Sequence, residues 1–138
     1  MTAIRIRGLD HVVLRVSDLA TSIDFYCDVL GCNEERRLDA LGLVQLRAGA
    51  CLIDLVDVAS PLGELGGRPP GSDARNMDHF AVALEAFDAA AIRSHLEAHG
   101  VEPGDVSERY GANGNGPSMY IRDPDGNVVE LKGPAADA

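Results

Sequence analysis

The dipeptide Asp-His occurs twice in this chain, and each copy opens a short apolar run of the kind that forms strands. Asp10-His11 is followed by Val12-Val13-Leu14, and Asp78-His79 is followed by Phe80-Ala81-Val82. Behind each run comes a helical pattern that stops at a glycine, Gly31 in the first case and Gly100 in the second. The chain is therefore predicted to contain an internal repeat, with one histidine at the same place in each half.

Both halves show the same predicted order of elements, β-α-β-β-β, from their hydrophobic periodicity. In the first half the strands are expected at residues 4–16, 32–38, 43–47 and 51–58, and the helix, with Ser17 or Asp18 as its cap, at 19–30. In the second half the strands are expected at residues 77–84, 101–110, 118–122 and 127–132, and the helix at 87–99. The glycine-rich residues 111–116 are expected to form a flexible loop, and Asp123-Pro124-Asp125-Gly126 a turn.

These boundaries predict an α+β fold made of two βαβββ modules in tandem. The first module covers residues 1–58, a linker rich in glycine and proline covers 59–76, the second module covers 77–132, and a frayed tail covers 133–138. A helix covers only one face of each small sheet. We therefore expect the modules to pair into a curved mixed sheet around a trough, with the helices on the outer face.

Strand parity predicts which residues line that trough. Side chains alternate across a strand, and each strand offers one purely apolar face for its helix. The opposite face carries one potential metal ligand on the first and last strand of each module: His11, Asp54, His79 and Glu130. The same parity places these further residues in the trough: Arg15, Gln45, Arg47, Ser118, Tyr120 and Arg122.

Two imidazoles with one or two carboxylates suit a divalent first-row metal, so Zn, Ni, Co, Mn and Fe are all candidates. Asp54 depends on the strand register, because a slip of one residue would present Asp57 in its place. Asp10 and Asp78 are expected to cap a strand end or to position the neighbouring histidines. The remaining histidines, His95 and His99, are expected to form an exposed pair on one helix face.

Composition excludes several classes of partner. The chain has 138 residues, and its formal net charge of -10 argues against nucleic acid and anionic membranes, which select basic patches. Residues 1–7 lack the apolar stretch of a signal peptide, and no apolar run is long enough to span a membrane. Cys27, Cys32 and Cys51 are odd in number, which favours reduced thiols and a cytoplasmic protein.

Three segments resemble the vicinal oxygen chelate superfamily, which includes glyoxalase I, extradiol dioxygenases, fosfomycin thiol transferases, methylmalonyl-CoA epimerase and bleomycin-resistance proteins. They are Leu9-Asp10-His11-Val12-Val13-Leu14-Arg15-Val16-Ser17-Asp18-Leu19, Ser22-Ile23-Asp24-Phe25-Tyr26-Cys27-Asp28-Val29-Leu30-Gly31 and Ser118-Met119-Tyr120-Ile121-Arg122-Asp123-Pro124-Asp125-Gly126-Asn127-Val128-Val129-Glu130-Leu131. The chain looks most similar to the uncharacterised glyoxalase-domain members.

The resemblance implies metal ligands at His11, His79 and Glu130, with Asp54 in the place of the fourth ligand of glyoxalase I. It also implies a small-molecule substrate that chelates the metal through two adjacent oxygens. A glyoxalase-type lyase or isomerase would use Glu130 or Asp54 as its base, and Tyr120 as a proton donor or as a trough-wall residue. An extradiol-type dioxygenase and a non-catalytic binding protein are the alternatives. By analogy with the superfamily, the chain is expected to form a homodimer.

Overall fold

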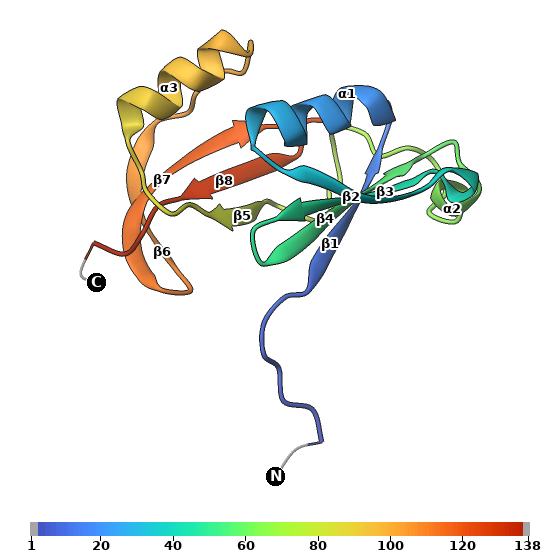
Figure 1. The fold of residues 1–138 in the computed structure, drawn as a ribbon, viewed down its shortest axis with the longest axis horizontal. Helices are drawn as coiled ribbons and strands as arrows, with labels where there is room; N and C mark the ends of the chain where they lie inside the picture. The colour runs from blue at the N-terminus through green and yellow to red at the C-terminus, as the bar shows by residue number, and fades with distance from the viewer. Residues whose placement is uncertain (1–2, 137–138) are drawn as a thin grey trace. The chain divides into compact units, whose positions relative to one another are not determined.

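The computed structural model of the chain describes residues 3–136, which divide into two compact units between Pro70 and Gly71 (Figure 1). Two predictions fall partly outside the described residues. They are the absence of a signal peptide, which includes residues 1–2, and the frayed tail, which includes residues 137–138. None of the helices within residues 3–136 has the length and apolar character that a membrane span requires.

The first unit is a four-stranded mixed sheet with one main helix. Its strands are β1 (His11–Val16), β2 (Asn33–Leu38), β3 (Leu43–Ala48) and β4 (Cys51–Asp57). Its helical segments are α1 (Leu19–Asp24), a π-helical continuation (Phe25–Val29), a 3-10 turn (Asp39–Leu41) and α2 (Pro61–Glu64). The strand order is β1-β4-β3-β2, and only β1 and β4 run parallel.

The second unit repeats this topology. Its strands are β5 (Phe80–Ala83), β6 (Val106–Gly111), β7 (Gly114–Arg122) and β8 (Val128–Lys132), and its helix is α3 (Ala89–Ala98). The strand order is β5-β8-β7-β6, with β5 parallel to β8. The predicted α+β fold with two βαβββ modules is confirmed.

The helices begin and end where the sequence places their signals. The carboxylate of Asp18 accepts a hydrogen bond from the Thr21 backbone N–H at the start of α1, and Asp88 caps α3 in the same way. The first helical segment is followed by Gly31 and α3 by Gly100, and both glycines have a positive φ, 78° and 71°.

The apolar faces predicted from parity form the core of each unit. In the first unit Val16, Leu46 and Leu55 are fully buried, and Tyr26 of the helical segment is buried with them. In the second unit these residues are buried: Leu96, Met119, Ile121, Val129 and Leu131. Because the odd and even residues of each strand differ in this way, the opposite strand faces are left for polar side chains.

The prediction of a flexible loop at residues 111–116 is wrong, because these residues form a tight hairpin. β6 pairs with β7 down to Gly111 and Gly114, and only two residues form the turn. Gly114 takes a φ of 112°, which suits glycine. A side chain at Gly116 would place its Cβ 2.3 Å from the carbonyl oxygen of Pro134. The glycines therefore serve close packing rather than flexibility.

Other boundaries also differ from the prediction. β6 begins at Val106 instead of residue 101, and β5 begins at Phe80 instead of residue 77. The first strand begins at His11 instead of residue 4, and Ile4, Ile6 and Leu9 are exposed, because alternation without a pairing strand does not make a sheet. The tail is not frayed at residues 133–136. Gly133 is buried and donates its N–H to the Pro117 carbonyl at 2.7 Å, so this segment continues along β7.

Candidate functional site

In the first unit, His11 and Asp54 lie on one face of the sheet. β1 and β4 pair in parallel with His11 opposite Leu52 and Val13 opposite Asp54. Paired residues point to the same face, and so do residues two apart on one strand. Asp57 falls on the other face of β4, so the one-residue slip considered from the sequence does not occur.

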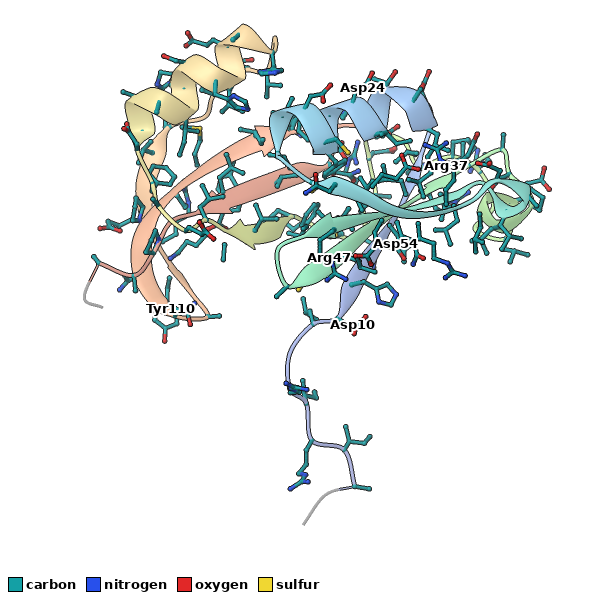
Figure 2. All side chains as sticks on the ribbon, viewed as in Figure 1. Asp10, Asp24, Arg37, Arg47, Asp54 and Tyr110 are labelled. Carbon is teal, nitrogen blue, oxygen red and sulfur yellow. The ribbon has the colours of Figure 1, made fainter. Side chains whose placement is uncertain are left out.

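Asp54 is a buried carboxylate with one oxygen unsatisfied. The residue is only 3% exposed, and its Oδ2 accepts a hydrogen bond from Gln45 Nε2 at 3.0 Å. Its Oδ1 is buried and has no hydrogen-bond partner among residues 3–136. A buried carboxylate oxygen without a donor is costly, so this atom is suited to a cation. Figure 2 labels Asp54 among the strands of the first unit.

In the second unit, His79 and Glu130 are in direct contact. His79 Nε2 lies 3.2 Å from Glu130 Oε1, and Glu130 is 6% exposed. β8 holds Glu130 between Ala81 of β5 and Tyr120 of β7, which are its partners across the sheet. The small side chain of Ala81 leaves the histidine and the carboxylate free to approach each other.

Each histidine is held by the aspartate that precedes it. His11 Nδ1 lies 2.7 Å from Asp10 Oδ1, and His79 Nδ1 lies 2.7 Å from Asp78 Oδ2. A carboxylate beside Nδ1 favours a proton on that nitrogen, and in this tautomer Nε2 is the nitrogen that can bind a metal. The hydrogen bond to Asp10 is also the main reason that the pKa of His11 is raised above its usual 6.5. Of the two roles expected for these aspartates, the contacts favour positioning the histidines.

Tyr120 and Arg109 extend the polar face of the second unit away from His79. The Tyr120 ring meets the His79 ring edge-on, with centroids 5.1 Å apart. The guanidinium carbon of Arg109 lies 4.3 Å from the centre of the Tyr120 ring, and Arg109 Nη1 donates to the backbone oxygen and hydroxyl of Ser118. Arg109 was missed from the sequence, because the pairing of β6 with β7 sets its face and the indistinct pattern of residues 101–110 did not reveal it.

The other trough arginines of the first unit are already engaged. Arg15 donates to three backbone carbonyls, those of Gly63, Gly67 and Arg68. Arg47 forms a two-point ion pair with Glu35. Neither guanidinium is therefore free to hold an anionic ligand.

The remaining two histidines, His95 and His99, are not among these site residues. His95 and His99 are both exposed on α3, with ring centroids 4.5 Å apart, and His99 Nδ1 is bonded to the His95 carbonyl. The expected surface pair is confirmed.

The donor atoms suit a divalent metal, and they are divided between the two units. His11 and Asp54 belong to the first, His79 and Glu130 to the second, and no cluster of three or more His, Cys, Asp or Glu side chains that could hold a metal is found within residues 3–136. Imidazole nitrogens combined with carboxylate oxygens form a donor set that first-row divalent ions accept. Each unit by itself carries half of the predicted donor set.

Comparison with known proteins identifies the family to which this topology belongs. Residues 8–131 match the Glyoxalase/Bleomycin resistance protein/Dioxygenase superfamily. The virulence protein STM3117 of Salmonella typhimurium is 34% identical over 127 residues, which cover 89% of this chain and 81% of that protein. Its crystal structure matches with a TM-score of 0.71 over 96% of this chain and 100% of that chain, at 28% identity.

Two further matches represent different activities. Biphenyl-2,3-diol 1,2-dioxygenase 2 of Rhodococcus globerulus is 30% identical over 127 residues, covering 88% of this chain and 60% of that protein. The crystal structure of lactoylglutathione lyase from Agrobacterium tumefaciens matches with a TM-score of 0.64, over 93% of this chain and 94% of that chain. At 24% identity, the lyase shows a shared fold only.

Proposed function

Because the chain belongs to the Glyoxalase/Bleomycin resistance protein/Dioxygenase superfamily, we propose that it is a metal-dependent enzyme of the glyoxalase type. Its substrate is a small molecule that chelates the metal through two adjacent oxygens, and the reaction is a lyase or isomerase step. The observation that carries this proposal is the same Asp-His pair in each unit, with a buried carboxylate on the same sheet face.

One divalent ion, Zn, Ni, Co, Mn or Fe, is proposed to bind His11, His79 and Glu130, with Asp54 as the fourth ligand. The unsatisfied Oδ1 of Asp54 supports its inclusion. The contact between His79 Nε2 and Glu130 Oε1 supports binding of one cation by both side chains, since both atoms are of the kind that a metal binds.

When bound, the ion would supply Lewis-acid chemistry by withdrawing electron density from the two substrate oxygens. Glu130 would then take the proton from the carbon beside the substrate carbonyl and return it to the neighbouring carbon. Asp54 is the alternative base. The Tyr120 hydroxyl makes no hydrogen bond to any residue in 3–136, so it is available to donate one to the substrate oxygen that gains negative charge.

Steady-state kinetics on the metal-loaded protein tests this function. The hemithioacetal of methylglyoxal and glutathione is the first substrate to measure. We expect Tyr120→Phe to lower kcat while the metal content stays unchanged, and His79→Ala to remove both metal and activity. Isomerisation that is independent of added metal would contradict the proposal.

An extradiol-type dioxygenase is the second candidate, favoured by the similarity to the Rhodococcus enzyme, which this chain covers only in part. Oxygen uptake with catechols under Fe(II) would identify this activity. A third possibility is a protein that binds and sequesters a small ligand without turnover. It would show metal-dependent ligand binding in the absence of both reactions.

We also propose a homodimer, by analogy with members of the superfamily, which often pair modules between chains. Light scattering coupled to size exclusion would show twice the mass of one chain, and a monomer at micromolar concentration would contradict it. Mixing His11→Ala and His79→Ala chains tests how the half-sites combine. One intact site returns in the mixed dimer only if each site takes one module from each chain.

A cytoplasmic location is proposed as well, and the three cysteines support it. All three are free thiols, as a reducing compartment would maintain.

A further inference from the structure

Arg109 has an open hydrogen-bonding edge on the same sheet face as His79 and Glu130. Its Nη1 donates to Ser118 O at 3.0 Å and to Ser118 Oγ at 2.7 Å. The Nε–H and the Nη2 donors make no hydrogen bond to any residue in 3–136. This Nε–Nη2 edge is one that can bind both oxygens of a carboxylate in a planar fork.

Arg109 has no counter-ion within residues 3–136, although the whole chain contains 22 acidic and only 12 basic residues. Arg37 and Arg47 pair with glutamates, but within residues 3–136 no carboxylate lies in ion-pair range of Arg109. Arg109 is partly buried, so its charge is less screened than that of a fully exposed arginine. The side chain is held by its hydrogen bonds to Ser118 and by its contact with the Tyr120 ring.

The distance from Arg109 to the histidine is set by one aromatic ring. The His79 ring is tilted at 73° to the Tyr120 ring, with centroids 5.1 Å apart, and the Arg109 Cζ lies over the Tyr120 ring, 4.3 Å from its centroid. A ligand whose chelating oxygens lie beside His79 could extend along the Tyr120 ring toward Arg109 with a second group.

We propose that Arg109 binds a carboxylate of the substrate, so that the substrate is a small organic anion with two vicinal oxygens at its opposite end. This inference rests on the proposed function and adds the chemical class of the substrate. Arg109 is a specificity residue: it binds the carboxylate and takes no part in proton transfer.

Three probes separate the two ends of such a ligand: 3,4-dihydroxybenzoate, the neutral 3,4-dihydroxybenzamide of the same shape, and catechol. Their affinities are measured by calorimetry with the Zn²⁺-loaded protein. We expect 3,4-dihydroxybenzoate to bind about 10- to 100-fold more tightly than the other two, the range of a charge-assisted hydrogen-bonded pair. Arg109→Gln should remove this preference and leave catechol binding unchanged, and Arg109→Lys should restore only part of it.

Arg93→Gln is the matched control, since it removes the same charge from the exposed surface of α3. The Arg93→Gln variant should still bind 3,4-dihydroxybenzoate more tightly than the two neutral probes. Loss of this preference in Arg93→Gln would overturn the assignment to Arg109. Equal affinity of the wild type for the three probes would overturn the carboxylate site while leaving metal chelation intact. Failure of all three to bind a stoichiometrically Zn²⁺-loaded protein would overturn both proposals.

Discussion

At the scale of single residues, each proposed histidine ligand is held by the carboxylate of the residue before it. Asp10 and Asp78 make the same 2.7 Å contact to Nδ1 in the two units. The strand face of each of the four proposed ligands could be predicted from the sequence, because the face depends only on the alternation of side chains along a strand. The sequence could not choose between the two roles considered for Asp10 and Asp78, because that choice depends on side-chain rotamers.

Asp78→Asn is expected to weaken metal binding about 10- to 100-fold, because the amide no longer supplies the charge that orients and polarises His79. A competition titration with a chelating dye measures the affinity. Asp105→Asn, which neutralises an exposed carboxylate of the same unit, should bind metal as the wild type does. Equal affinities for the two variants would contradict a positioning role for Asp78.

Cys32 is expected to be the slowest of the three cysteines to react with iodoacetamide at pH 8. Burial raises the pKa of its thiol from 9.0 to about 11, so almost none of it is thiolate in the folded protein. The raised pKa also determines how the stability of the fold changes with pH. This preference for the neutral thiol stabilises the fold fully below pH 9, and the stabilisation is lost as the pH rises through about 11.

Peptide mapping after timed labelling measures the three rates. In urea the differences between the cysteines should disappear. Fast labelling of Cys32 in the folded protein would show that the thiol is not buried.

At the scale of elements, the sequence predicted which strands and helices exist better than it predicted their ends. Asp18, Asp88, Gly31 and Gly100 are local signals, and they mark the helix termini correctly. The start of β1 and the hairpin between β6 and β7 depend on which strand lies beside them. The hydrophobic pattern within one segment does not show which strand pairs with it. Residues 4–10 and 111–116 were therefore assigned wrongly.

Gly116→Ala is expected to destabilise the protein by about 1–3 kcal/mol, the usual cost of overpacking. The added Cβ would lie 2.3 Å from the Pro134 oxygen and 3.0 Å from the Gly133 oxygen, and both are backbone atoms that cannot move aside cheaply. Gly8→Ala is the matched control, because nothing lies within 4 Å of the added atom.

Urea denaturation of the two variants and the wild type measures the free energy of unfolding. A wild-type midpoint for Gly116→Ala would mean that the segment after β8 does not pack against the hairpin. The flexible loop expected from the sequence would then be the better description.

At the scale of the whole molecule, the repeat explains why a chain of 138 residues has two units with the same strand order. Each unit uses its helix to cover one sheet face and carries one histidine and one buried carboxylate on the other. The repeated Asp-His dipeptide was sufficient to predict this duplication. The role proposed for Arg109 could not be inferred from the sequence, because Arg109 joins the face only through the pairing of β6 with β7.

The metal content of the purified, reconstituted protein tests the central claim most directly. Elemental analysis after loading with Zn²⁺ and gel filtration should give one equivalent per chain. His11→Ala and His79→Ala should each lose most of it, although the two histidines lie in different units, and Glu130→Gln should bind more weakly. A variant with both His95→Ala and His99→Ala should keep one equivalent. Full occupancy in His11→Ala or in His79→Ala would contradict a metal bound by both halves of the repeat.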